Sequence, residues 1–146
     1  MLGLLNNMKI IEIFKTKKEY KIITLYKLES GSYISSLPIS ILEIESSIDN
    51  LYDEINRLLN HSRKISSKEE QKFWLGSDLL KHLKISSFKK LYTSSSSCNV
   101  SLINDEFRVI TKIYDTKLKA LIESDNISTF EKNDFKSLVE FIKFKL

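Results

Sequence analysis

The sequence predicts an α/β fold of the α+β kind: a single domain in which a mostly antiparallel sheet of about five strands is covered by helices. Short runs that alternate apolar and polar residues predict the strands, and longer stretches with apolar residues three or four positions apart predict the helices. The length of 146 residues, with 42% hydrophobic and 29% charged residues, is typical of one folded domain. The predicted order of elements is β-β-α-α-α-β-β-β-α. Residues 8–146 should form the domain and residues 1–7 a disordered extension, with Met1 and Met8 both open as the native start.

The first predicted elements are two strands. Residues 8–14 and 20–26 are rich in isoleucine and aromatic residues, and the polar residues 15–19 separate them, which predicts a β-hairpin. Gly31 and Pro38 then indicate an irregular stretch.

Helices follow. The clearest has apolar residues in one stripe, at spacings of four, three, four, three and one: Ile44, Ile48, Leu51, Ile55, Leu58 and Leu59. Ser46 and Asp49 are placed to cap its start. A second helical segment is predicted from Ser67, because Ser67 and Glu70 have the spacing of a capping box, and Gly76 could divide this segment in two.

A short third helix is predicted from Ser87, and the chain then returns to strands. Residues 98–102 and 107–113 alternate around an Asn104-Asp105 turn, which predicts a second hairpin, and residues 118–122 could add one more strand. The apolar positions of a C-terminal helix are Phe135, Leu138, Val139 and Ile142.

The charge of the chain is unevenly distributed. Between Leu28 and Asn56 there are six acids and no lysine or arginine, so this segment carries −6; the chain carries +4, which leaves +10 for the rest. The six acids are Glu29, Glu43, Glu45, Asp49, Asp53 and Glu54. Such a segment can be the solvated face of a helix, or an acidic surface that attracts a basic partner.

No residue pattern in the chain is typical of an enzyme. His61 and His82 lie 21 residues apart, without a second His or Cys at ligand spacing near either. A Gly-rich phosphate loop and a nucleophile elbow are also absent from the sequence. We therefore expect a binding protein with no catalytic residue, no cofactor and no metal site, and not an enzyme.

Cys98 is the single cysteine, so the chain cannot form an internal disulfide. It lies in an alternating apolar run, which predicts a buried, unreactive thiol. No leader peptide and no apolar run of membrane-spanning length can be recognised in the sequence. We therefore expect a cytoplasmic protein without a membrane partner.

Lysines in and around the first hairpin suggest an alternative function as a small basic nucleic-acid-binding module. These lysines are Lys9, Lys15, Lys17, Lys18, Lys21 and Lys27. Phe14, Tyr20 and Tyr26 lie among them and could stack on bases while the lysines contact phosphates. However, the chain has only three arginines, and lysines at strand edges also prevent aggregation, so nucleic acid is not the expected partner.

Several segments follow one another in an order known from a protein family. Residues 33–38 combine a strand pattern with a Leu-Pro pair, the helix from Ile48 to Asn60 comes next, and Ser62-Arg63 closes it. The order continues with Phe73-Trp74, residues 85–92, the hairpin from Val100 to Ile113 and the helix from Phe135 to Ile142. Over roughly residues 8 to 144 the chain resembles the immunity proteins of contact-dependent growth inhibition (CDI) systems.

This resemblance implies a non-catalytic bacterial immunity protein that stays in the cytoplasm. Its partner would be the cognate toxin's C-terminal domain, commonly a nuclease, which a neighbouring cell delivers. Because each immunity protein is fitted to its own toxin, the resemblance implies no particular binding residues.

The acidic helix is the candidate toxin-binding face. Nuclease surfaces that hold phosphates are basic, so an acidic helix face could cover one and be attracted to it by charge. The candidate residues are Glu45, Asp49, Tyr52, Asp53 and Asn56, with Tyr52 as an aromatic anchor. Alternatively, Tyr52 borders the core and the acids only keep the helix soluble. The sequence leaves the identity of the toxin and the oligomeric state open.

Overall fold

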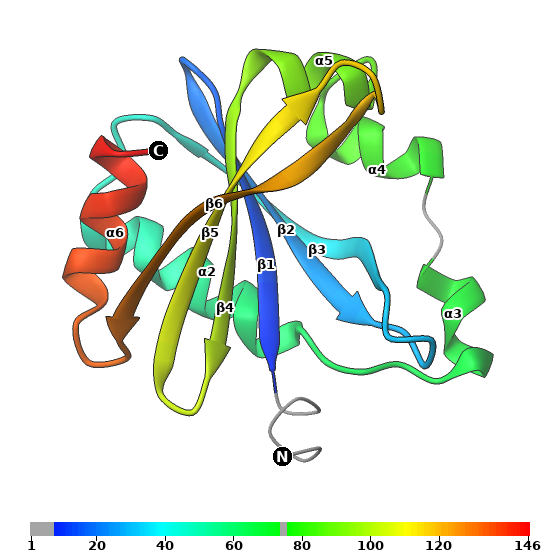
Figure 1. Cartoon of the computed structure of the whole chain (residues 1–146), viewed down its shortest axis with the longest axis horizontal. Helices are drawn as coiled ribbons and strands as arrows, with labels where there is room; N and C mark the ends of the chain where they lie inside the picture. Colours follow the sequence, from blue (N-terminus) through cyan, green and yellow to red (C-terminus); the bar gives the residue numbers. More distant parts are fainter. Residues whose placement is uncertain (1–7, 74–75) are drawn as a thin grey trace.

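The computed structural model describes residues 8–73 and 76–146. The expected disorder of residues 1–7, and Trp74 of the resemblance, lie outside the described residues. One antiparallel sheet of six strands, in the order β3-β2-β1-β4-β5-β6, runs through the molecule, and helices pack against both of its faces (Figure 1). The strands are β1 (Lys9–Lys15), β2 (Glu19–Lys27), β3 (Tyr33–Glu43), β4 (Ser96–Ile103), β5 (Glu106–Asp115) and β6 (Ala120–Glu131). The helices are α2 (Ile48–His61), α3 (Ser67–Phe73), α4 (Gly76–Leu83), α5 (Phe88–Ser94) and α6 (Phe135–Phe144).

The predicted α+β fold class is confirmed, but the sheet has six strands where about five were expected. The additional strand is β3, in the stretch that Gly31 and Pro38 marked as irregular. β3 lies at the edge of the sheet, where a proline does not remove a needed hydrogen bond. Its register against β2 jumps from Ile23–Ile39 to Thr24–Ser36, so that Pro38 falls in a bulge.

The second predicted helical segment contains two described helices, and the later one begins at Gly76, where a division was predicted. These helices are α3 and α4, so among the described residues four helices precede β4 where three were predicted. The predicted start of the next helix is also confirmed, because the Ser87 hydroxyl accepts a 3.0 Å hydrogen bond from the Lys90 N–H. Over residues 8–73 and 76–146 the order of elements is therefore β-β-β-α-α-α-α-β-β-β-α.

The cap of α2 lies one residue beyond the predicted one. The Ser47 hydroxyl, and not Ser46, accepts the hydrogen bond, from the Asn50 N–H at 3.1 Å. The carbonyl oxygen of Ser46 instead accepts a bond from the Lys143 ammonium at 2.5 Å. This bond ties the start of α2 to the last turn of α6.

The capping box of α3 is displaced in the opposite direction. The Ser66 hydroxyl accepts from the Glu69 N–H at 3.3 Å, and the Glu69 carboxylate accepts from the Ser66 N–H at 3.2 Å. The predicted pair, Ser67 and Glu70, is therefore wrong by one residue. Arg63 also donates to the Glu69 carboxylate at 2.8 Å, and mainly this bond lowers the pKa of Glu69 to about 2.

The central strands β1, β2 and β4 are covered on both faces, whereas no residue of the edge strand β6 is fully buried. The main core lies between one face and helices α2 and α6, and the helical stripe predicted for α2 points into it: Leu51, Ile55, Leu58 and Leu59 are all fully buried. A second apolar cluster lies between the other face and helices α4 and α5, and its buried members are Phe14, Ile23, Leu79, Leu83 and Leu91. Cys98 is fully buried in the main core, which confirms the predicted buried thiol.

The hairpin turn between β4 and β5 and the last strand of the sheet were both predicted. Asn104 and Asp105 both have positive φ angles, 49° and 62°, which confirms the predicted two-residue hairpin turn. The strand expected over residues 118–122 begins at Ala120 and continues to Glu131. This strand, β6, pairs with β5 and forms the edge of the sheet opposite β3.

Ser62 fastens the end of α2 to the sheet. Its buried hydroxyl accepts from the Ile10 N–H at 2.9 Å and donates to the Leu25 carbonyl at 2.7 Å, so it joins two directly opposed residues of β1 and β2. We expect Ser62→Ala to lower the free energy of unfolding by about 1–3 kcal/mol, because two buried backbone groups lose their partner. Urea unfolding measures this loss.

The matched control for that experiment is Ser86→Ala, at an exposed serine. It should change the free energy of unfolding by less than about 0.5 kcal/mol. Equal stabilities of the two variants would show that Ser62 does not hold α2 to the sheet.

Candidate protein-binding surface

The structure places the five predicted toxin-binding residues on α2 and just before it. Asp49 and Asp53 are exposed and lie one helical turn apart, and Asn56 is half-buried on the next turn. Glu45 is exposed in the turn between β3 and α2, so it precedes the helix and does not extend its face. The acids therefore reach solvent, as the hypothesis of an acidic face requires.

Tyr52 borders the core, as the alternative interpretation stated. Its ring stacks on Phe135 of α6, with 4.2 Å between ring centroids and 24° between planes, and it packs against the main core. It is half-buried, and it also lines a surface cavity. Tyr52 is consequently fixed in position and presents only one side outward.

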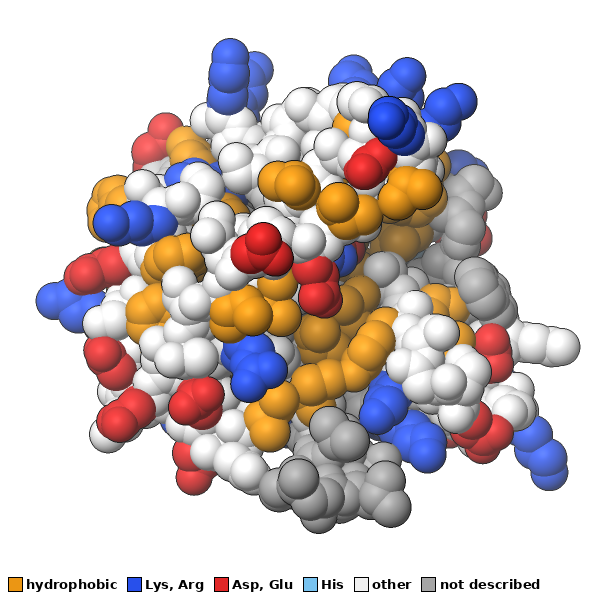
Figure 2. All heavy atoms as spheres, in the orientation of Figure 1, with side chains coloured by type: hydrophobic (Ala, Val, Ile, Leu, Met, Phe, Trp, Pro, Cys, Tyr) orange, Lys and Arg blue, Asp and Glu red, His pale blue; other side chains and the backbone are white. Residues whose placement is uncertain are grey.

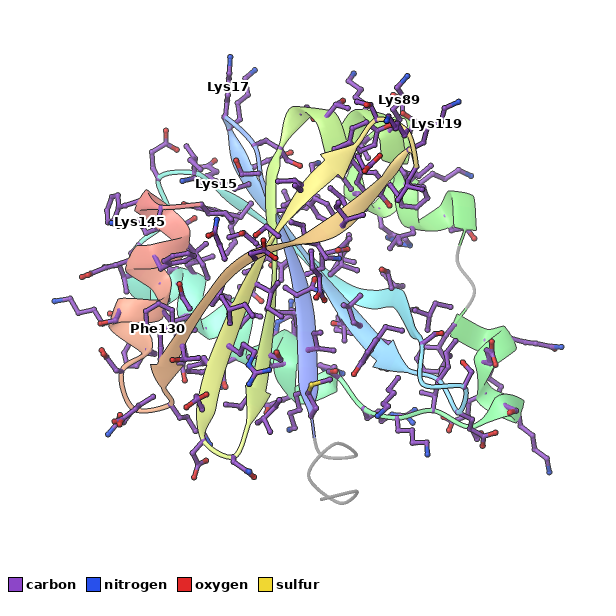
Figure 3. The ribbon with its side chains drawn as sticks, viewed as in Figure 1. Lys15, Lys17, Lys89, Lys119, Phe130 and Lys145 are labelled. Carbon is purple, nitrogen blue, oxygen red and sulfur yellow. The ribbon has the colours of Figure 1, made fainter. Side chains whose placement is uncertain are left out.

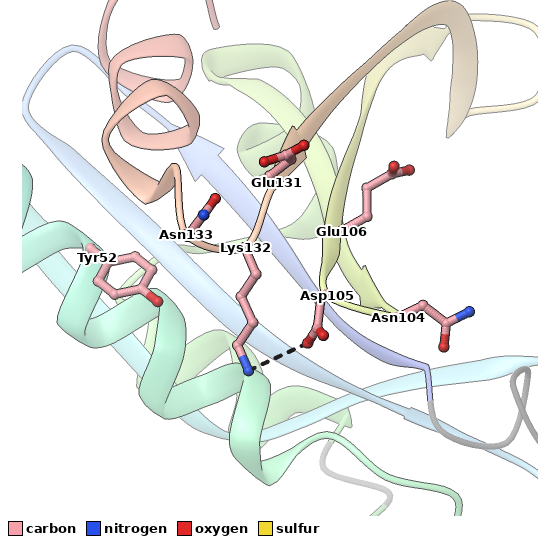
Figure 4. Close-up of a pocket in the computed structure, with 7 residues that line it drawn as sticks. All are labelled: Tyr52, Asn104, Asp105, Glu106, Glu131, Lys132 and Asn133. Carbon is pink, nitrogen blue, oxygen red and sulfur yellow. Dashed lines mark ion pairs between the residues drawn. The ribbon is translucent and has the colours of Figure 1, made fainter.

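This cavity lies where α2 meets two turns of the sheet (Figure 4). Its volume is about 700 Å³. Asn104, Asp105 and Glu106 line it from the β4–β5 turn, and Glu131, Lys132 and Asn133 line it from the connection between β6 and α6. The Lys132 N–H donates to the Asp105 carbonyl at 2.8 Å, which holds the two turns together.

The cavity is acidic. Three carboxylates and one ammonium group line it, which gives a net charge of −2. The ammonium of Lys132 lies 3.8 Å from the Asp105 carboxylate, but both side chains are largely exposed, so this pair is weak. Glu106 and Glu131 have no ion-pair partner within 4 Å among the described residues.

We call the outer acids of α2 and those of the cavity, together, the acidic surface. Its members are Asp49, Asp53, Asp105, Glu106 and Glu131, and Tyr52 lies at the junction between its two parts. Figure 2 shows acidic side chains gathered at the lower left, around the ends of β4, β5 and β6. Chemically, the acidic surface can accept charge-assisted hydrogen bonds from lysine or arginine side chains.

Sequence reasoning missed the cavity acids: it placed Asp105 in a hairpin turn and assigned no binding role to Asp105, Glu106 or Glu131. The only feature that could have indicated the cavity was the order and direction of the predicted strands. In an antiparallel sheet alternate connections lie at the same end, so the turn after β4 and the turn after β6 meet.

The histidines lie outside the cavity. His61 is exposed at the end of α2, and His82 is exposed on α4. Within residues 8–73 and 76–146, no three His, Cys, Asp or Glu side chains are grouped so that they could hold a metal ion. No helix in this part of the chain is long and apolar enough to cross a membrane.

The aromatic residues of the first hairpin are buried, which corrects the alternative of base stacking there. Phe14 and Tyr20 are each 1% exposed and Tyr26 is 4% exposed. The Tyr26 hydroxyl is also engaged, as a donor to the Leu37 carbonyl at 2.6 Å. The physical reason is that β1 and β2 are covered on both faces, so neither face presents its rings to a nucleic acid.

Ser62 and Arg63, which close the helix in the family resemblance, have structural contacts. Ser62 joins α2 to the sheet, and the Arg63 guanidinium lies 5.7 Å from the centre of the Phe73 ring while it pairs with Glu69. These two residues position the segment between α2 and α3 and do not line the acidic cavity.

Comparisons with known proteins find similarity in structure only. No protein-family model matches the chain, and no curated protein matches it. A solved protein of unknown function from Neisseria meningitidis is 16% identical, with a TM-score of 0.74 over 97% of this chain and 94% of its own. A chain of the CdiA-CT/CdiI toxin and immunity complex from Yersinia pseudotuberculosis is 13% identical, with a TM-score of 0.53 over 78% of each chain. At such low identities these likenesses show a shared fold.

Proposed function

We propose that this chain is a CDI immunity protein that binds its cognate toxin domain in the cytoplasm. It neutralises the toxin, a nuclease, by covering the active or substrate-binding surface. The observation that carries the proposal is the acidic surface, in a fold similar to that of a chain from a toxin and immunity complex. The family resemblance in the order of sequence elements supports the same function.

The charge of the acidic surface fits a nuclease. A nuclease holds a phosphate backbone with lysines and arginines, and a neutralising partner must present acids to the same groups. Asp49 and Asp53 project into solvent from successive turns of α2. The neighbouring cavity of about 700 Å³ has room for a lysine or arginine side chain, which Glu106 and Glu131 could bind.

The acidic surface is also held rigidly, so little conformational freedom would be lost on binding. Ser47 caps the start of α2, Ser62 ties its end to the sheet, and Tyr52 stacks on Phe135 between them. In this proposal the chain performs no catalysis and acts through this preformed surface.

Charge reversal on α2 tests the proposal. The cognate toxin domain would be identified by co-purification. The two proteins would then be purified separately, and their association rate measured at low and high salt. We expect Asp49→Lys with Asp53→Lys to lower the association rate at least tenfold at low salt, because the attraction between acidic and basic surfaces is lost. Protection of cells against the toxin should fall in parallel.

The matched control is Asp78→Lys with Asp125→Lys, at two exposed acids outside the acidic surface. It makes the same change in net charge and should leave the association rate within about twofold. If the α2 variant binds as the native protein does, the acidic surface is not the interface. If the native protein neither binds the toxin nor protects against it, the proposed function is wrong.

A further inference from the structure

Six lysines project from one end of the molecule, which we call the basic end. They are Lys17 and Lys18 of the β1–β2 turn, Lys89 and Lys90 of α5, and Lys117 and Lys119 of the β5–β6 turn. Lys17, Lys89 and Lys119 lie along the upper edge in Figure 3, and Figure 2 shows basic side chains all along the same edge. All six lysines are exposed.

The fold gathers these lysines from segments that are far apart in the sequence. The antiparallel order of the sheet places the β1–β2 and β5–β6 turns at the same end. α5 lies between them, because Tyr92 is 6.0 Å from Phe14 of β1 and 6.3 Å from Tyr114 of β5, measured between ring centroids. The three lysine pairs therefore form one surface.

The three segments of the basic end are strongly positive, and the acids beside them are the exposed Glu43 and Glu45, on either side of Ile44, whose N–H donates to the Lys18 carbonyl at 2.9 Å. Residues 16–18, 88–90 and 115–119 contain the six lysines and one acid, a net charge of +5, whereas the whole chain carries +4. The acid, Asp115, is used to shape its turn, because it accepts from the N–H groups of Lys117 and Leu118 at 2.8 and 2.9 Å. Among the described residues none of the six ammonium groups has an ion-pair partner within 4 Å or a hydrogen-bond acceptor.

An exposed leucine stands between two of these lysines. Leu118 is 68% exposed at the tip of the β5–β6 turn. Lys119 completes the turn with a φ of 55°, a left-handed conformation that glycine or asparagine adopts more easily than lysine. The turn thus presents an apolar side chain flanked by two cations.

This combination fits an anionic lipid surface better than a nucleic acid. Lysines near such a surface are attracted to its phosphates and carboxylates, and an apolar side chain at a turn tip can enter the boundary between headgroups and acyl chains. Nucleic-acid surfaces add arginines or exposed aromatic rings that contact bases. The three segments contain no arginine, and their one aromatic residue, Phe88, is half-buried and packs in the second apolar cluster.

We propose that the basic end is a surface for reversible binding to anionic membranes, with the six lysines at the headgroups and Leu118 inserted between them. The expectation of no membrane partner came from the lack of a long apolar run, and that observation concerns only segments that cross a bilayer. Surface binding through the basic end is independent of toxin binding through the acidic surface.

Vesicle sedimentation tests this inference with the full chain. The probes are vesicles of about one-third phosphatidylserine in phosphatidylcholine, and vesicles of phosphatidylcholine alone, at about 0.05 M and about 0.3 M NaCl. We expect binding to the phosphatidylserine vesicles at low salt, at least tenfold weaker binding at high salt, and none to pure phosphatidylcholine.

Two sets of variants locate the binding surface. Replacing Lys17, Lys18, Lys89 and Lys119 by glutamate should weaken vesicle binding at least tenfold. The matched control replaces four exposed lysines elsewhere, Lys64, Lys68, Lys72 and Lys136, with the same change in net charge, and should retain most of the binding. Equal losses in both sets would overturn the assignment to the basic end.

A fluorescent probe at position 118 tests insertion. Cys98 is fully buried, so an environment-sensitive dye attached to Leu118→Cys labels that site selectively. Its emission should shift to the blue with phosphatidylserine vesicles. The inference is overturned if the protein binds no vesicle, or if it binds a single-stranded oligoribonucleotide more tightly than the vesicles with no change at the probe. The second result would identify a nucleic-acid surface.

Discussion

Replacing Glu12 with glutamine is expected to lower the free energy of unfolding by about 3 kcal/mol or more. Glu12 of β1 and Lys112 of β5 form an ion pair across β4, with 2.7 Å between carboxylate and ammonium. Their side chains are only 12% and 15% exposed. The variant leaves the Lys112 ammonium in this poorly solvated position without its counter-charge. Urea unfolding of the native and variant proteins at pH 7 measures the loss.

A double variant distinguishes the lost charge pair from a loss of packing. Glu12→Leu with Lys112→Met removes both charges, and we expect it to recover most of the stability, because no buried charge is left unpaired. Lys112→Met alone should be about as destabilising as Glu12→Gln. If the free energy of unfolding falls by less than about 1 kcal/mol in each single variant, the two groups are effectively solvated. The pair then contributes no more stability than an exposed ion pair on the surface.

Cys98 is expected to react with thiol reagents only when the protein unfolds. The thiol is fully buried, and burial raises its pKa from 9.0 to about 12. At pH 8 its thiolate fraction is therefore about a thousandfold smaller than that of an ordinary thiol, and the reagent cannot reach it in the folded protein. Labelling with a colorimetric disulfide reagent should be at least a thousandfold slower in the native protein than in high urea.

An exposed thiol in the same fold provides the control. Ser86→Cys in a Cys98→Ala background should react at the rate of an unfolded chain. Because the pKa of Cys98 is raised by folding, the protonated thiol contributes stability that is fully present below pH 9 and is lost as the pH rises toward about 12. Fast labelling of native Cys98 at pH 8 would contradict both its burial and its raised pKa.

Local pattern predicted most of the helices and strands, and the exceptions have identifiable causes. The stripe of Leu51, Ile55 and Leu58 predicted a buried helix face because a helix repeats every 3.6 residues. β3 was left out of the predicted order of elements, although residues 33–38 have a strand pattern, because Pro38 indicates a break in most strands. This strand lies at the edge of the sheet and carries a bulge at the proline.

Two of the five acids of the acidic surface were predicted in the same way. Asp49 and Asp53 follow from the period of α2, since residues opposite a buried stripe face solvent. The cavity acids could not follow from any period, because Asp105 and Glu131 approach α2 only through the order of the strands. The burial of Tyr20 and Tyr26 likewise depends on helices covering both faces of the sheet, which alternation within one strand does not reveal.

The sequence alone therefore determined the fold class, the buried stripe of α2, the hairpin turn at Asn104-Asp105 and the buried thiol of Cys98. Each depends on residues a few positions apart, whose side-chain directions the local backbone sets. Only the tertiary structure decided which distant residues share a surface, at the acidic cavity and at the basic end. The reason is that strand order fixes which connections meet at each end of the sheet, and strand order is set by the packing of the whole chain.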